Sequence, residues 1–137
     1  MTQLDVQSNL DQEVKNFADD FDIDIVYPNT QYRPVEGTDF IRISYINGDV
    51  AQISPMEDSL NRTTITLQLD IFTNPDEGKY RAKQIVDDLI NHFKRGLVIN
   101  NNNIKTRVTS FVLIDNLQEL NKNMLIVRVN TRSDYVN

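Results

Sequence analysis

The chain has no cysteine and a single histidine among its 137 residues. The absence of cysteine excludes disulfides, thiolate nucleophiles and cysteine-based zinc sites. Only His92 remains for acid-base or metal chemistry near neutral pH. Four glycines leave little scope for a phosphate-binding loop, and the common nucleotide-binding and hydrolase motifs are missing. We therefore expect no enzymatic activity, no cofactor and no bound metal.

Positive charge is also scarce, because 14 Lys and Arg residues face 20 Asp and Glu residues, which gives a net charge of −6. Proteins that grip a nucleic-acid backbone rely on clustered cations, so specific DNA or RNA binding is not expected. No apolar run approaches the ~20 residues that span a bilayer. The start, Met1 to Asp5, lacks the basic and apolar regions of a signal peptide, so we expect neither export nor membrane insertion.

The length and composition fit one globular domain covering residues 1–137. Hydrophobic residues make up 39% of the chain and charged residues 25%, which is close to the average for globular proteins. No long polar linker divides the sequence into two cores.

Two segments have the three-to-four-residue apolar spacing of an amphipathic helix. The first runs from Val6 to Phe21. The second has an apolar stripe from Ala82 to Phe93, follows the acidic segment Asn74–Gly78, and ends at Lys94-Arg95-Gly96. Acidic residues before a helix, and cations and glycine after it, are typical helix boundaries.

The other apolar segments alternate with a period of two or are rich in β-branched residues, as strands are. Asn47-Gly48 resembles a turn that closes the second of these strands. The predicted strands are Phe21–Val26, Asp39–Ile46, Arg62–Phe72, Leu97–Ile99, Ile104–Ile114 and Met124–Thr131. The order of elements predicts an α+β fold with a mixed, mainly antiparallel sheet and both helices on one face.

The polar stretch from Gly48 to Asn61 contains Pro55 and alternates poorly, so it predicts a long loop. Apolar side chains such as Ile53 and Met56 on such a loop either mark a partner site or fold back onto the sheet as a lid. Both readings remain open. The candidate partner-interface residues are Asp49, Gln52, Ile53, Met56, Glu57 and Arg62.

Three patterns could carry chemistry, but each has a simpler explanation. Asp20, Asp22 and Asp24 match the opening of a calcium loop, yet Ile25 stands where that loop needs glycine. His92 lies in the last helical turn, where a cation complements the helix dipole. Adjacent carboxylates such as Asp87-Asp88 point in different directions on a helix. A small carboxylate-based hydrolase is the enzymatic alternative.

From about Tyr27 to Thr131, the sequence resembles the tail terminator proteins of long-tailed bacteriophages, also labelled minor tail or tail completion proteins. The resemblance rests on Asp39-Phe40-Ile41-Arg42-Ile43 before a long polar stretch and on the strand from Arg62 to Phe72. It continues through Pro75-Asp76-Glu77-Gly78 and the helix from Ala82 to Phe93, followed by the two closing strands.

The resemblance implies a structural virion protein that forms a homo-oligomeric ring, a hexamer, at the head-proximal end of the tail tube. The ring would end tube polymerisation and form the tail side of the head-tail joint. Its partners would be the major tail tube protein and a head-completion or stopper protein, and DNA would pass the lumen without specific binding. We also hypothesise that acidic residues line this lumen. Another neck or stopper protein is the closest alternative.

Overall fold

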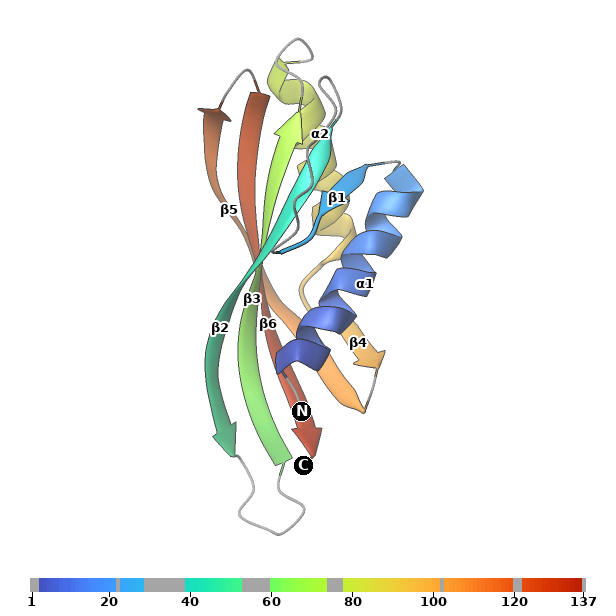
Figure 1. Cartoon of the computed structure of the whole chain (residues 1–137), viewed down its shortest axis with the longest axis vertical. Helices are drawn as coiled ribbons and strands as arrows, with labels where there is room; N and C mark the ends of the chain where they lie inside the picture. The colour runs from blue at the N-terminus through green and yellow to red at the C-terminus, as the bar shows by residue number, and fades with distance from the viewer. Residues whose placement is uncertain are drawn as a thin grey trace.

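The computed structural model describes residues 3–21, 23–28, 39–52, 60–73, 78–101, 103–119 and 122–136. In chain order these residues form α1 (Gln3–Phe21), β1 (Asp24–Val26), β2 (Phe40–Gln52), β3 (Leu60–Thr73), α2 (Gly78–His92), β4 (Val98–Asn101), β5 (Ile104–Glu119) and β6 (Lys122–Val136). The strands make one sheet in the order β1-β2-β3-β6-β5-β4 (Figure 1). Only β1 and β2 pair in parallel. The predicted α+β fold is confirmed.

The central pair, β3 and β6, runs in unbroken antiparallel register from Leu60 opposite Val136 to Thr73 opposite Asn123. The alternation seen in the sequence sets its two faces, because successive strand residues point to opposite sides. The inward side chains of β3 are almost wholly buried: Ile65, Leu67, Leu69 and Ile71. The side chains between them, such as Gln68 and Asp70, lie on the other face.

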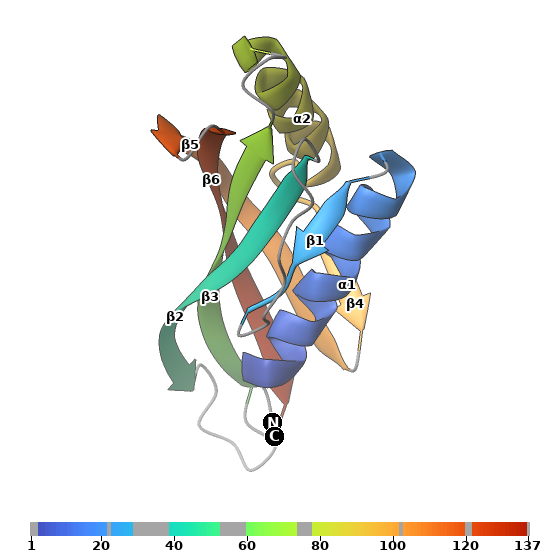
Figure 2. The same ribbon diagram turned by 45° about the horizontal axis from the view of Figure 1, so that its top comes forward.

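Both helices lie on the same side of the sheet (Figures 1 and 2). Each turns one apolar stripe toward the inner face of the strands, and together they form the main core. The stripe of α1 comprises Val6, Leu10, Val14 and Phe17, and that of α2 comprises Ala82, Ile85, Val86, Leu89 and Phe93. Gly96 follows α2 with a φ of 90°, as expected of a glycine after a helix end. Neither helix is long and apolar enough in the described residues to cross a membrane.

Two polar contacts fix α1 in place. The Tyr45 hydroxyl on β2 bonds to the Asp11 carboxylate and lies 3.0 Å from the backbone oxygen of Gln7. Near the middle of α1, Glu13 Oε1 lies 2.7 Å from Nε2 of His92, the last residue of α2, and this contact joins the two helices. Burial raises the pKa of both Tyr45 and Asp11, while the hydrogen bond from Tyr45 partly offsets the rise at Asp11. His92 therefore has a structural contact between helices.

The predicted turn at Asn47-Gly48 is wrong, because β2 continues through it to Gln52. The register changes from Asn47 opposite Ile65 to Val50 opposite Thr63, so β2 carries one extra residue here. This is a β-bulge. A side chain on Gly48 would meet Thr64 Oγ1 at 2.1 Å and Thr64 O at 2.8 Å. Glycine here serves close approach between two strands, a role that shares its sequence signature with a turn.

The strands are also longer than predicted. β5 extends to Glu119 and β6 from Lys122 to Val136, so both strands continue past the segments whose apolar pattern predicted them. β5 has two register shifts, near Thr109 and Ile114. Bulges increase the local twist, and the described sheet is strongly twisted (Figure 1).

The two outer strands of the sheet are short. β1 pairs only with Phe40 to Arg42 at one end of β2, and β4 pairs only with Ile104 to Arg107 at one end of β5. Val108 is also held, by backbone bonds to Gly96 and Leu97. Beyond these points, no further strand of the described residues pairs with the outer edge of β2 or of β5.

Replacing Gly48 by alanine should destabilise the fold by ~1–3 kcal/mol, since an added methyl overlaps the Thr64 backbone as well as its side chain. Urea unfolding measures the change. Adding Thr64→Ala should restore part of the loss, because it removes the Oγ1 contact but leaves the carbonyl contact. Gly96→Ala is the control for backbone strain alone, as nothing lies within 4 Å of its added Cβ. An unchanged stability in Gly48→Ala would contradict the bulge geometry.

Tyr45→Phe should raise the pKa of Asp11 further, because it removes the hydrogen bond that lowers this pKa and keeps the burial that raises it. A raised carboxyl pKa costs stability once pH rises through the unfolded value of about 3.8. The stability deficit of the variant should therefore be larger at pH 7 than at pH 3. Carboxyl-carbon NMR titration of Asp11 measures the shift directly, and an unmoved Asp11 titration would refute the assignment.

Candidate functional site

Two helices on one face leave the opposite face of the sheet uncovered in the described residues, and this outer face carries most of the polar strand side chains. By register it includes Arg42, Gln68, Asp70, Arg128 and Asp134. A second surface feature is the groove between α2 and β5, which also exposes side chains.

The predicted interface residues are only partly visible. Ile53, Met56 and Glu57 lie outside the described residues, as do the side chains of Asp49 and Gln52. The predicted loop start at Gly48 is wrong, since the backbone from Gly48 to Gln52 belongs to β2. The backbone of Val50 to Gln52 lies at the end of the sheet where β3 begins, opposite Thr63 to Asn61.

Arg62 is the predicted residue whose side chain the structure defines. It forms a two-point pair with Asp134 on β6, with Nε to Oδ1 at 2.8 Å and Nη2 to Oδ2 at 3.2 Å. The hydrogen bond from Arg62 lowers the pKa of Asp134, with smaller contributions from the positive charges of Arg132 and Lys105. Asp134 thus lies among several cations at the Arg62 end of the outer face.

A series of polar contacts, which we call the polar ladder, crosses the middle of the outer face. Arg42 binds Asp70 through Nε at 3.1 Å and Nη2 at 2.9 Å, and Gln68 donates to the other Asp70 oxygen at 3.0 Å. Arg128 donates to Gln68 at 3.1 Å. Next to it, Asn130 accepts from Thr66 and donates to Ser110. These contacts tie four strands together without any helix above them.

The end of the outer face opposite Arg62 is apolar. Phe40 and Phe72 stack with ring centroids 4.5 Å apart, and Met124 packs with them as a small second core. The Arg42 guanidinium lies 5.0 Å from the centre of the Phe72 ring, within the range of a cation–π contact. The outer face therefore grades from an apolar end to a cationic end.

Charge is divided between the two sides of the molecule. The described outer face carries six cations, Arg42, Arg62, Lys105, Arg107, Arg128 and Arg132, against three carboxylates, Asp24, Asp70 and Asp134. α1 has the opposite balance, with Asp5, Asp11, Glu13, Asp19 and Asp20 against Lys15 among its described side chains. An acidic protein thus presents a basic sheet face.

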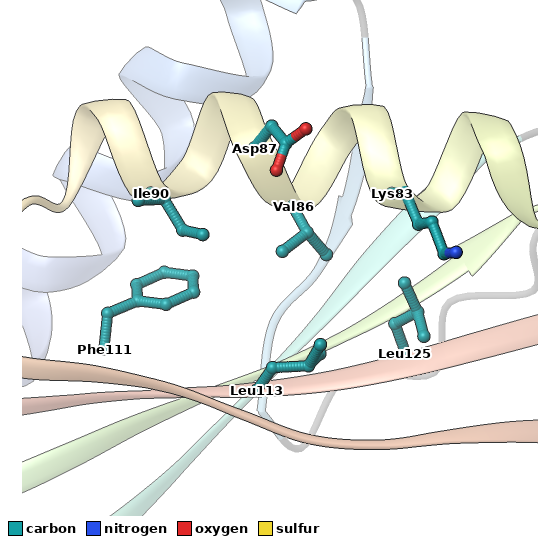
Figure 3. Close-up of a pocket in the computed structure, with 7 residues that line it drawn as sticks. All are labelled: Lys83, Val86, Asp87, Ile90, Phe111, Leu113 and Leu125. Atoms are coloured by element: carbon teal, nitrogen blue, oxygen red, sulfur yellow. The ribbon is translucent and has the colours of Figure 1, made fainter.

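A groove opens between α2 and the upper part of β5, as Figure 3 shows. Val86 and Ile90 point down from α2, while Phe111, Leu113 and Leu125 point up from β5 and β6. Lys83 and Asp87 complete its rim, and the cavity volume is about 430 Å³. Leu113 and Ile90 are 54% and 41% exposed, so the groove presents apolar surface to solvent.

The described residues contain no group of three or more His, Asp or Glu side chains that could hold a metal ion. Asp22 of the calcium-like pattern lies outside these residues, and Asp20 and Asp24 are exposed at the end of α1 and in β1. The patterns considered for chemistry do not converge on one site in the described part of the chain.

The sequence did not identify Asp134, Asp70 or the groove as features of interest. Asp134 belongs to an alternating polar series on β6, Arg128, Asn130, Arg132 and Asp134, which was a visible signal. Its pairing with Arg62 depends on the β3–β6 register, which residue patterns alone do not reveal.

Asp134→Asn tests the Arg62 pair. A lowered carboxyl pKa contributes stability above the unfolded value of about 3.8, and this contribution is lost as pH falls through the folded value. The variant should lose under ~1 kcal/mol at pH 7, as exposed ion pairs do, and the loss should disappear in acid and shrink in high salt. Denaturant unfolding at several pH values measures this. Asp20→Asn, an exposed carboxylate on α1, is the matched control. A loss independent of both pH and salt would argue against the pair.

Comparisons with known proteins agree with this architecture. A solved structure whose name states no function is similar to this chain, with a TM-score of 0.72 and 16% sequence identity. The alignment covers 100% of this chain and 96% of the chain in the solved structure. At this identity the likeness concerns the fold alone. A search of curated proteins found no significant match. The family model described as phage tail terminator protein matches residues 5–132. The chain therefore belongs to the phage tail terminator family, a family of structural tail components.

Proposed function

We propose that this protein caps the head-proximal end of the phage tail tube as a ring, ends tube polymerisation and forms the tail side of the head-tail joint. The observation that carries the proposal is the match of the tail terminator model to residues 5–132. In this proposal the ring is a homohexamer in the virion tail, assembled in the host cytoplasm. It contacts the major tail tube protein on one side and a head-completion or stopper protein on the other.

The shape of the subunit supports a role in assembly. The helices cover one face of the sheet, while the outer face has a rigid polar ladder and the strand edges expose apolar side chains. A rigid, polar surface suits recognition of a fixed partner, because little side-chain entropy is lost on binding. Capping then follows from occlusion: a ring bound to the last tube layer covers the surface on which the next layer would add.

The Arg62 end of the sheet is our candidate for a partner contact. Arg62 is held by Asp134 in one orientation, and Lys105, Arg107 and Arg132 lie around the same carboxylate. We assign Asp49, Gln52, Ile53, Met56 and Glu57 to the same contact, since they follow or precede this end in the chain.

The direct test is electron microscopy of phage particles produced without this protein. We expect tails of uncontrolled length that fail to join heads, and restoration of uniform, joined tails when the native gene is supplied in trans. Tails of normal length that remain detached would instead indicate another neck or stopper protein. Normal, head-attached tails would exclude both roles.

A further inference from the structure

The exposed apolar side chains of the strands gather on the two edges of the sheet that lack a neighbouring strand. On β2 they are Ile46 and Val50, and on β5 they are Val112, Leu113 and Ile114, with exposed fractions between 41% and 54%. We call Ile43–Asn47 with Val50–Gln52 the β2 edge, and Thr109–Glu119 the β5 edge. No strand of the described residues pairs with the outer side of either edge.

These edges contain bulges, but stretches of both lack charged residues and proline, two of the usual protections against pairing. Isolated edge strands commonly carry charged residues, proline or a covering element. Ile43-Ser44-Tyr45-Ile46-Asn47 and Thr109-Ser110-Phe111-Val112-Leu113-Ile114 contain no charged residue and no proline. An uncharged, apolar edge is typical of a strand that pairs with another chain.

We propose that the β5 edge of one copy of this chain pairs, antiparallel, with the β2 edge of the next copy, and that this contact joins the subunits head to tail. The inference rests on the ring proposed above and names its interface. β2 and β5 run in opposite directions within the sheet (Figure 1). Copies in the same orientation around a ring therefore bring their β5 and β2 edges together antiparallel.

The positions of the edges fit a closed ring. Across the four strands β2, β3, β6 and β5, Ile43 is in line with Leu113, and Asn47 is in line with Val108. From this line the β2 edge extends toward the Arg62 end of the sheet, and the β5 edge extends toward the opposite end. The midpoints of the edges differ by about five residues, or ~17 Å along the strands, across four strands that span ~19 Å. Pairing them fully inclines the strands by ~40° to the ring axis, and strands in closed barrels are inclined by about 35–45°.

The short outer strands and the groove complete the match. β1 stops at Val26, opposite Arg42, and β4 pairs with β5 only up to Arg107, so no strand of the described residues pairs with β2 or β5 where the neighbouring copy would enter. With the edges fully overlapped, Val50 of one copy falls close to Phe111 and Leu113 of the next. Its exposed side chain would then enter the apolar groove beneath α2, whose lining includes Ile90.

Cysteine cross-linking tests this contact, because the native chain contains no cysteine. In Val50→Cys/Leu113→Cys, the two sites of one chain lie six residues apart along the sheet with β3 and β6 between them, so a short bis-maleimide cannot bridge them within one chain. We expect a ladder of covalent multimers that ends at the size of the ring. Each single variant should stay monomeric on denaturing gels, since a head-to-tail contact does not bring two identical sites together. Phe21→Cys/Tyr80→Cys, exposed apolar positions on the helices, is the matched control and should give no ladder.

A second measurement uses lysine to block each edge. Ile46→Lys and Leu113→Lys should each convert the assembled protein to monomer in analytical ultracentrifugation, while Tyr80→Lys should leave assembly unchanged. Circular dichroism confirms that each variant is folded. If the native chain forms rings but the edge variants do so too, or if single-cysteine variants cross-link, the edge interface is wrong and the ring remains. A native chain that forms no ring, alone or with tail tubes, overturns the ring proposal and this inference with it.

Discussion

The structure depends on the unbroken pairing of β3 with β6. Every residue from Leu60 to Thr73 has a partner on β6, and the pair carries apolar side chains on one face and polar side chains on the other. Because side chains alternate strictly along a strand, a slip of one residue in this register would turn Gln68 and Asp70 toward the apolar core and Leu67 and Leu69 away from it. The register shifts that the sheet does contain lie in the β2–β3 and β5–β6 pairings. The register irregularities thus lie on both sides of an unbroken central pair.

Much of the fold can be predicted from the sequence because residues that face the core must be apolar, and their spacing differs between a helix and a strand. The helices around Val14 and Leu89 and the strand around Leu67 have a periodicity that only one element type satisfies. Asn47-Gly48 failed as a turn signal, because the glycine answers a need for space beside Thr64 that only the neighbouring strand creates. Strand ends were also missed. Beyond their apolar segments, β5 and β6 continue through polar residues, and such residues give the same sequence pattern as a polar turn.

The candidate site was less predictable for a related reason. Arg62 was identified from its place at the start of a strand, but Asp134, its partner, lies 72 residues further on and meets it only through the register. The groove requires two residues from different elements, Ile90 and Leu113, to remain uncovered together. Tertiary pairings of this kind leave no local signal in one sequence.

Joining the subunits through their edges constrains which side of the sheet faces the ring axis. Six copies contributing four strands each, inclined by ~40°, give a sheet radius on the order of 24 Å. A layer of helices ~10 Å thick inside that radius would narrow the bore severely, whereas helices outside leave it open.

The outer face of the sheet would then line the lumen, and the acidic side chains of α1 would lie outside. In this arrangement the lumen would be lined not by acidic side chains but by a ladder in which Asp70 and Gln68 engage Arg42 and Arg128, and Asp134 engages Arg62. Such pairing holds cations in fixed hydrogen bonds and reduces their attraction for passing phosphates. Because Lys105, Arg107 and Arg132 lie on the same face, the lumen would stay basic, and passage of DNA would depend on how far the Arg42 and Arg62 pairs lower its charge, not on a surplus of carboxylates.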